Sequence, residues 1–149
     1  MSRFFDLDAA NETLPELRTI LETLRDERTQ LIALRDEFAR RAALETTPGD
    51  AAAGRVPDDA ARRNREDAVE RKRLRLRMQG VIDQMQAGVA RIDELGVTLR
   101  EIDTGLVDFP ALVNGRQVWL CWRLGEGDVE WWHELSDGFT GRRPLIELA

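Results

Sequence analysis

The sequence lacks most of the residues that commonly carry catalysis or crosslinks: its 149 residues include one cysteine, one histidine and no tyrosine. The single cysteine, Cys121, cannot form a disulfide within the chain, which favours a reducing, cytoplasmic compartment. A zinc ion usually needs three or four histidine, cysteine or carboxylate ligands. Because every ligand beyond one cysteine and one histidine would have to be a carboxylate, we expect no metal ion and no cofactor.

Long apolar runs and a positive charge balance are missing as well. No stretch is long and apolar enough to cross a bilayer, and the first residues lack the apolar region of a secretion signal. The formal net charge is −6, which gives no support to nucleic acid or an anionic membrane as a partner. Of the 22 basic residues only Lys72 is a lysine, a bias that indicates a GC-rich bacterial genome. We expect a bacterial, cytoplasmic protein with no nucleic-acid and no membrane partner.

Two segments carry the apolar repeat of long α-helices. Residues 6–44 have apolar side chains at helical spacing, with Asp6 placed to cap the first turn. In residues 60–103, apolar residues alternate at steps of four and three, as in a heptad seam. The seam consists of Met78, Ile82, Met85, Val89, Ile92, Gly96 and Leu99. Residues 45–59, between the helices, hold two prolines and two glycines and predict a mobile loop.

Helices of matched length joined by one loop predict an antiparallel, coiled-coil-like hairpin. We expect this hairpin to form a single domain of residues 1–149 together with a C-terminal module, residues 104–149. Because an isolated pair of helices buries little apolar surface, we expect either a homodimer or docking of the C-terminal module on the helices.

The C-terminal module holds all four tryptophans of the chain. Three apolar runs, residues 105–109, 117–124 and 129–135, are separated by turn signals at Asn114-Gly115 and at residues 125–128. This pattern predicts a three-stranded antiparallel sheet. The fold class is therefore expected to be α+β, a long helical hairpin with a small C-terminal sheet.

The register of the last hairpin decides which side chains meet, because side chains alternate between the two faces of a strand. If Leu124 lies opposite Val129, then Trp122, Trp131 and His133 share the face to be buried. The other face then carries Trp119, Cys121, Arg123, Glu130 and Trp132. With this register Cys121 and His133 lie on opposite faces, which argues against joint metal ligation and against a catalytic dyad. A slip of one residue would undo this assignment.

The segment 62–77 carries eight basic and three acidic side chains. One hypothesis is a phosphate-binding stripe. The other is a solvated helix face whose arginines pair with Asp26, Glu27 and Glu37. No aromatic residue lies between the basic ones to stack on bases, so we favour the solvated face.

Two groups of candidate functional residues follow from these patterns. The candidates for an anionic ligand are His133, Arg142, Arg143 and Asp108, since glycines and arginines in residues 138–143 suit carboxylate or phosphate. We expect His133 to be buried and bonded to Asp108 or to a helix residue. The candidates for a partner surface are Trp119, Trp132, Arg123 and Glu130.

Two functions remain open on these grounds. The first is a non-enzymatic binding or scaffold protein, with a protein partner on the tryptophan-rich sheet. The alternative is a small-molecule-binding protein or enzyme with its site around His133 and residues 138–143. A partner surface should leave Trp119 or Trp132 exposed and flat. A ligand site should show a pocket in which polar groups converge on His133.

Several short motifs resemble a known bacterial family. They are the start from Phe5 through Asn11 to Leu17, then residues 105–110, 120–126 and 132–133, and finally Gly138-Phe-Thr-Gly-Arg-Arg-Pro144. Together they resemble the domain of unknown function that bears the number 2203 in its series. The sequence departs from that pattern at Ala9, where a glutamate is expected. The resemblance implies that the C-terminal stretch is a unit, and it implies no reaction.

Overall fold

The computed structural model describes residues 3–44 and 58–148. The elements are α1 (Leu7–Ala43), α3 (Asp58–Glu94), β1 (Thr98–Glu101), β2 (Leu106–Val113), β3 (Arg116–Arg123), β4 (Trp131–His133), η1 (Phe139–Gly141), β5 (Arg143–Pro144) and η2 (Leu145–Glu147). The expected α+β fold with a helical hairpin and an antiparallel sheet is confirmed. The mobile loop expected at residues 45–59 lies outside the described residues, apart from the two positions that open α3.

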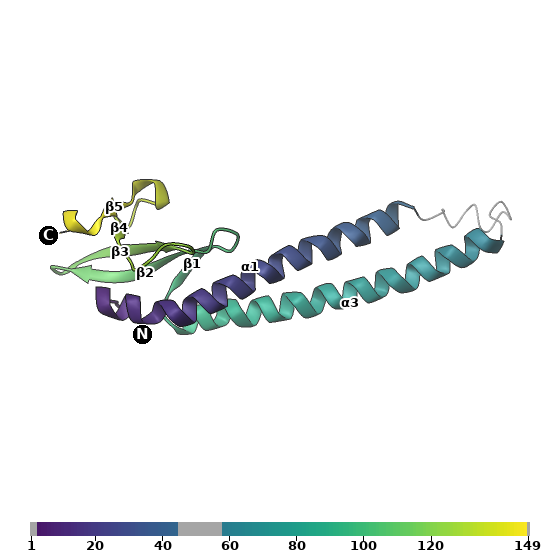
Figure 1. Ribbon diagram of the computed structural model, residues 1–149, viewed down its shortest axis with the longest axis horizontal. Helices are drawn as coiled ribbons and strands as arrows, with labels where there is room; N and C mark the ends of the chain where they lie inside the picture. The colour runs from purple at the N-terminus through teal and green to yellow at the C-terminus, as the bar shows by residue number, and fades with distance from the viewer. Residues whose placement is uncertain (1–2, 45–57, 149) are drawn as a thin grey trace. The chain divides into compact units, whose positions relative to one another are not determined.

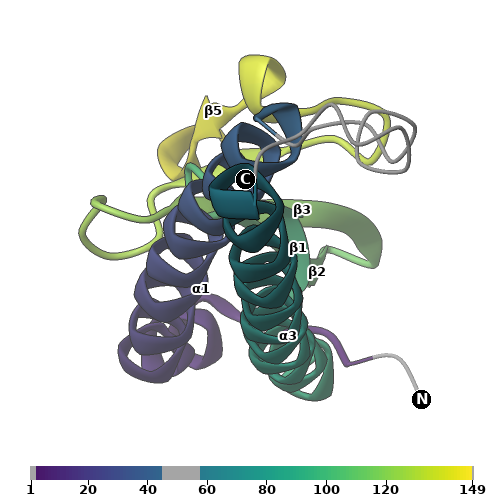
Figure 2. The same ribbon diagram turned by 90° about the vertical axis from the view of Figure 1, so that its right-hand side faces the viewer.

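The chain divides into two compact units. The sheet unit comprises residues 1–28 and 85–149, and the helical unit comprises residues 29–84. In each unit α1 lies beside α3 (Figure 1, Figure 2). The expected cap of α1 is confirmed, because the backbone N–H of Ala9 donates to Asp6 Oδ1 at 2.7 Å. Neither helix has a described stretch long and apolar enough to cross a membrane.

The second helix ends earlier than expected. Gly96, which lies inside the range 60–103 assigned to that helix, has a φ of 82°, in the left-handed region that favours glycine. The N–H of Val97 donates across it to the carbonyl of Ile92 at 3.3 Å, as in a Schellman cap. The expected place of Gly96 in a helical seam is therefore wrong, and the residues that follow it form β1.

The buried face of α3 matches the expected seam only in part, since Ile92 is buried and Met85 is partly buried. Leu74 and Val81 are buried, whereas Val89, a seam residue in the sequence pattern, is 38% exposed. The close helix–helix approach occurs at Gly88, where an added Cβ would lie 3.1 Å from Leu24 Cδ2 of α1. Glycine is tolerated here because it lets the two helices pack at short range.

The sheet has five antiparallel strands in the order β1-β2-β3-β4-β5, two more than expected. β1 arises from residues assigned to the helix, and β5 is only two residues long. The Asn114-Gly115 turn between β2 and β3 is confirmed, with φ of 52° and 75° as a tight hairpin turn requires. Gly105 lies close to the end of β3, since an added Cβ would meet Leu124 Cβ at 2.5 Å.

One face of the sheet packs on the helices and forms the core. In Figure 1 the start of α1 lies against one face of β2 and β3, while the C-terminal segment lies on the other side. The inner face contributes apolar side chains from β2, β3 and β4. These are Val107, Phe109, Ala111, Val118, Leu120, Trp122 and Trp132, which meet Leu14, Leu17, Leu21, Leu24 and Ile92 from the helices.

The expected register of the last hairpin is wrong by one residue. Cys121 pairs with Trp131, and Trp119 pairs with His133. Side chains that pair directly share a face, so Trp119, Cys121, Trp131 and His133 all lie on the outer face. The physical reason is a long-range contact: the N–H of Val129 donates to the side chain of Asn11 on α1 at 2.7 Å, not to a sheet partner.

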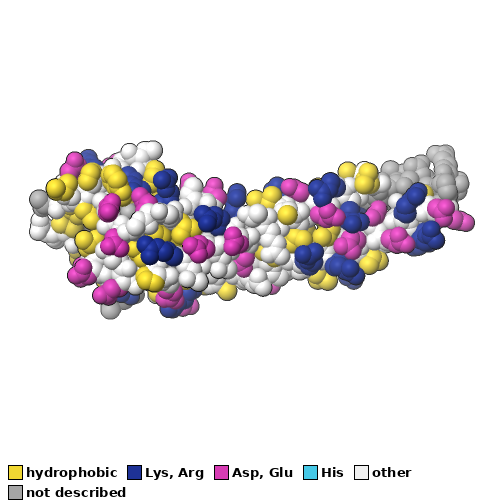
Figure 3. All heavy atoms as spheres, in the orientation of Figure 1, with side chains coloured by type: hydrophobic (Ala, Val, Ile, Leu, Met, Phe, Trp, Pro, Cys, Tyr) yellow, Lys and Arg dark blue, Asp and Glu magenta, His cyan; other side chains and the backbone are white. Residues whose placement is uncertain are grey.

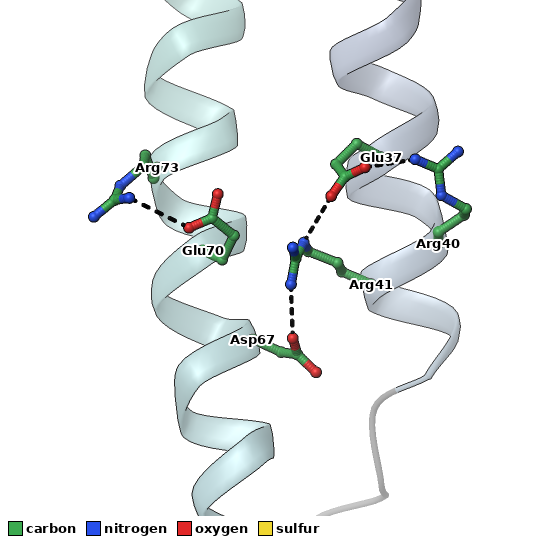
Figure 4. Close-up of polar contacts among 6 residues, drawn as sticks. All are labelled: Glu37, Arg40, Arg41, Asp67, Glu70 and Arg73. Carbon is green, nitrogen blue, oxygen red and sulfur yellow. Dashed lines mark hydrogen bonds and ion pairs between the residues drawn. The ribbon is translucent and has the colours of Figure 1, made fainter.

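The helical unit carries a mixture of opposite charges. In Figure 3 basic and acidic side chains are interspersed over the helices on the face shown. Arg41 bridges the two helices by binding Asp67 at 2.9 Å, and Glu37 pairs with arginines of its own helix (Figure 4). Arg73 pairs with Glu70 at 3.6 Å along α3. These contacts agree with a solvated helix face for residues 62–77, but the acidic partner expected at Glu37 pairs with Arg40 and Arg41 of α1 instead.

Candidate ligand site on the outer face of the sheet

The outer face of the sheet carries three buried side chains with titratable groups, those of Asp108, Cys121 and His133. Asp108 on β2 lies directly opposite Cys121 on β3. His133 on β4 lies two residues beyond the partner of Cys121 and on the same face. The three side chains are 3%, 1% and 1% exposed, respectively. Burial of this set on the face away from the helices needs a cover and polar partners.

Hydrogen bonds hold the histidine between two oxygens. His133 Nε2 lies 3.0 Å from Asp108 Oδ1, and Nδ1 lies 2.9 Å from the carbonyl oxygen of Glu134. A carbonyl only accepts, so Nδ1 carries a proton and donates it. The other carboxylate oxygen of Asp108 accepts from Arg100 Nε at 2.9 Å. The expectation of a buried His133 bonded to Asp108 is confirmed.

The thiol of Cys121 is protonated at neutral pH. Burial, together with the nearby negative charges of Asp108 and Glu126, raises its pKa to about 12 against the lowering effect of Arg142. A nucleophilic cysteine needs a lowered pKa and a free base. Both ring nitrogens of His133 are engaged with other oxygens. The arrangement therefore does not match a cysteine–histidine nucleophile.

The residues that follow β4 cover the outer face; we call residues 134–142 the covering segment. Arg142 holds this segment in place through contacts with a neighbouring loop and with β4. It pairs with Glu126 in the β3–β4 loop, and its guanidinium carbon lies 4.5 Å from the ring centre of Trp131 and 4.6 Å from that of Phe139. Arg123 lies over the same Phe139 ring at 4.9 Å.

A pocket of about 380 Å³ opens between the sheet and the covering segment. Asp108 and Cys121 form part of its wall, and Arg100 lies at its side. The remaining lining residues are Glu101, Leu106, Leu135, Asp137, Gly138 and Phe139. The pocket therefore lies over the carboxylate that holds His133, and polar groups converge there.

The structure separates the ligand candidates named from the sequence. Asp108 and His133 meet, but neither Arg142 nor Arg143 lines this pocket. Arg142 is occupied by Glu126 and two aromatic rings. Arg143 belongs to β5 and lies over the Trp132 ring at 5.4 Å. The expected clamp of two arginines around an anion is not formed at His133.

The partner-surface candidates do not form one surface. Trp132 is 2% exposed and belongs to the core, whereas Trp119 is half-buried on the outer face beneath Arg100. In the expected register Arg123 would also lie opposite Glu130, but β3 pairs with β4 in a different register. The guanidinium of Arg123 lies over Phe139, and the Glu130 carbonyl accepts from the N–H of Leu145.

The sequence did not predict that Arg100 binds Asp108, nor that Cys121 and His133 lie on the same face of the sheet. Arg100 was assigned to a helix, and only the glycine at position 96 followed by Val97-Thr98-Leu99 signalled a strand there. β1 has an irregular register between Leu99 and Glu101, and Arg100 lies within it. This irregularity brings its side chain to Asp108.

Comparison with known proteins identifies the family of the chain, but it gives no information about a reaction or a ligand. The uncharacterised conserved protein family DUF2203 matches residues 3–145, a range that includes both α-helices and nearly all of the sheet unit. No curated protein and no solved structure matches the chain. The resemblance noted in the sequence is thus confirmed over almost the whole length. The chain belongs to the DUF2203 family.

Proposed function

We propose that the protein binds a small polar molecule or ion in the pocket between the outer face of the sheet and the covering segment. The observation that supports this most is the convergence of buried Asp108, Cys121 and His133 beside an accessible cavity. Buried charges are costly to maintain and need a compensating contact. Clusters of polar groups in a pocket are more typical of binding sites than of cores.

The charges around the pocket favour a ligand with positive charge. Three carboxylates, on Glu101, Asp108 and Asp137, line it together with one guanidinium, on Arg100. One of these carboxylates is already paired with that guanidinium. This balance replaces the anionic ligand expected from the sequence with a cationic one.

The alternative hypothesis of a scaffold protein is supported less by the surface of the sheet than by the surface of the helices. Val69 and Leu76 on α3 are 63% and 67% exposed and lie seven residues apart, so they share one helix face. We propose that the helical unit associates with a second copy of the chain through this face. We also propose that the protein is bacterial and cytoplasmic, and the buried free thiol of Cys121 supports the location.

A pocket-filling variant tests ligand binding. At Gly138, a lining residue with extended backbone, an added Cβ would meet nothing within 4 Å. Gly138→Leu should therefore fold normally while occupying the pocket. Gly127→Leu is the matched control, because Gly127 also has free space around it and does not line the pocket.

The measurement is thermal stabilisation of the full chain by divalent ions and small amines. A ligand at 100 times its Kd should stabilise the wild type and the control by about 2.7 kcal/mol. The Gly138→Leu variant should show no shift. Equal shifts in all three proteins would place binding elsewhere, and no shift from any compound would contradict the proposal.

A further inference from the structure

The three buried side chains on the outer face also form a set of metal ligands. One oxygen of Asp108, the sulfur of Cys121 and a ring nitrogen of His133 all lie within 4.8 Å of one another. They come from three adjacent strands, so the backbone ladder fixes their spacing. Metal sites built on strands are positioned more precisely than sites on loops.

The hydrogen bonds around these residues orient them toward a common point. Because His133 Nδ1–H donates to the Glu134 carbonyl, Nε2 is the nitrogen that faces Asp108 Oδ1 at 3.0 Å. In metalloproteins a ligating histidine commonly donates its other N–H to a carbonyl or carboxylate. Ligating carboxylates are themselves held by outer hydrogen bonds, as Asp108 Oδ2 is held by Arg100.

We propose that Asp108 Oδ1, Cys121 Sγ and His133 Nε2 bind one thiophilic divalent transition-metal ion, with Zn²⁺ as the first expectation. A sulfur, a nitrogen and an oxygen form a ligand set that suits zinc and its neighbours, whereas Mg²⁺ and Ca²⁺ prefer oxygen alone. The carboxylate and thiolate charges offset the two positive charges of the ion. On binding, two protons leave to solvent as the metal bonds form: the thiol proton, and the proton shared between His133 Nε2 and Asp108 Oδ1.

Three protein ligands leave one position of a tetrahedral ion free. Asp108 and Cys121 line the pocket, so this position opens toward it and takes a water or a donor atom of a small molecule. The inference rests on the proposed function, because it identifies the cation of that pocket. It proposes a metal ion in place of the expectation of none, which rested on the scarcity of ligands and on placing Cys121 and His133 on opposite faces.

Cobalt titration of the full chain tests the site directly. The protein is stripped with EDTA, dialysed and titrated with Co²⁺, with the absorption spectrum as readout. We expect one Co²⁺ per chain, a sulfur-to-cobalt charge-transfer band and visible bands of a tetrahedral ion. Zn²⁺ should displace the Co²⁺ and abolish these bands.

Single variants assign the ligands. Cys121→Ser should lose the charge-transfer band, and His133→Gln and Asp108→Asn should weaken Co²⁺ binding by about 100-fold or more, since even outer partners of a ligand cost 10–100-fold. Asp128→Asn is the control: it alters an exposed carboxylate that does not line this pocket and should bind as the wild type does. Circular dichroism confirms that each variant is folded.

The outcomes separate this inference from the proposed function. No charge-transfer band in the wild type, or an unchanged band in Cys121→Ser, overturns the metal site whatever the variants do. If the EDTA-treated protein then still binds a small amine that Gly138→Leu excludes, the pocket proposal survives alone. Loss of both metal and small-molecule binding overturns the two together.

Discussion

Trp122 connects three parts of the sheet unit through one side chain. It is fully buried, its indole N–H donates to the Gly127 carbonyl at 2.8 Å, and the Arg18 guanidinium lies 5.5 Å from its ring centre. Arg18 of α1 donates to the same carbonyl at 3.1 Å. One residue thus fixes the β3–β4 loop against both the core and the first helix.

Removal of this ring should be among the most destabilising single changes in the chain. Trp122→Ala should lower the free energy of unfolding by about 3–5 kcal/mol, because it leaves a large cavity in the core. Leu112→Ala is the control, since Leu112 is 48% exposed and should cost less than about 1 kcal/mol. Urea denaturation measures both; a loss under about 1 kcal/mol for Trp122→Ala would contradict the assignment of the inner face.

Because the thiol of Cys121 is buried, the free energy of unfolding should decrease as the pH rises in the alkaline range. Burial raises the pKa of Cys121 to about 12 in the folded protein, whereas an unfolded cysteine titrates near about 8.5. The folded state therefore holds the proton more tightly, and its stabilising effect is complete below the unfolded pKa. As pH rises toward 12, the unfolded state releases the proton first and unfolding becomes easier.

In the EDTA-treated protein the free energy of unfolding should fall by up to about 1.4 kcal/mol per pH unit above pH ~9. The chain suits this measurement because it has no tyrosine and only one lysine, Lys72, to titrate in the same range. Cys121→Ser should flatten the profile between pH 8 and ~10.5. A slope identical in the two proteins would show that the thiol is not buried.

At the scale of elements, the end of α3 shows how a glycine converts a helix into a strand. Gly96 adopts a φ of 82°, and an added Cβ would also lie 3.3 Å from Arg3 Cβ. Gly80, in the same helix, has open space around it and no such backbone requirement. The two glycines therefore form a matched pair with opposite expectations.

Gly96→Ala should destabilise the protein by about 1–2 kcal/mol, the cost of a left-handed conformation for a residue with a Cβ. Gly80→Ala should stabilise it by about 0.5–1 kcal/mol, because alanine favours the helix and restricts the unfolded chain. Thermal unfolding of both variants checks the signs. If Gly96→Ala were also stabilising, the helix would continue through this position as the sequence first indicated.

Local patterns in the sequence predicted those parts of the fold that depend on local physics. The cap at Asp6, the Asn114-Gly115 turn and the periodicity of α1 each depend on neighbours within a few residues. The register of β4 does not, because it depends on Asn11, which is 118 positions from Val129 along the chain. A loop of the right composition fits either register, so periodicity alone cannot choose between them.

The same dependence on contacts distant in sequence limits how much of the candidate site could be predicted. The Asp108–His133 contact was one of two predicted alternatives, the other being a helix residue, because a buried histidine needs a polar partner. Cys121 was excluded from it by the wrong register, and Arg100 by the wrong end of α3. The first error is a shift of one position in a strand, which moves a side chain to the other face. The second extends the expected helix nine residues beyond Glu94, where α3 ends.

At the scale of the whole molecule, the two units differ in how much apolar surface they bury. Among the described residues of the helical unit, the buried apolar side chains are Leu34, Leu74 and Val81, whereas the core of the sheet unit draws on both helices and four strands. Since hydrophobic burial is the main source of stability, the proposed association with a second copy should stabilise mainly the helical unit. The exposed Val69 and Leu76 offer the surface that a second copy would cover.

Replacing both of these residues with lysine should therefore separate a dimer without unfolding the monomer. We expect the wild type to sediment as a dimer, and Val69→Lys/Leu76→Lys to sediment as a monomer with unchanged circular dichroism at low temperature. The double variant should also melt earlier, because the lost interface stabilised the folded state by mass action. Leu135→Lys serves as the control, since Leu135 is 51% exposed but lies in the sheet unit. A wild type that is monomeric at all concentrations, or a double variant that stays dimeric, would contradict association through this face of α3.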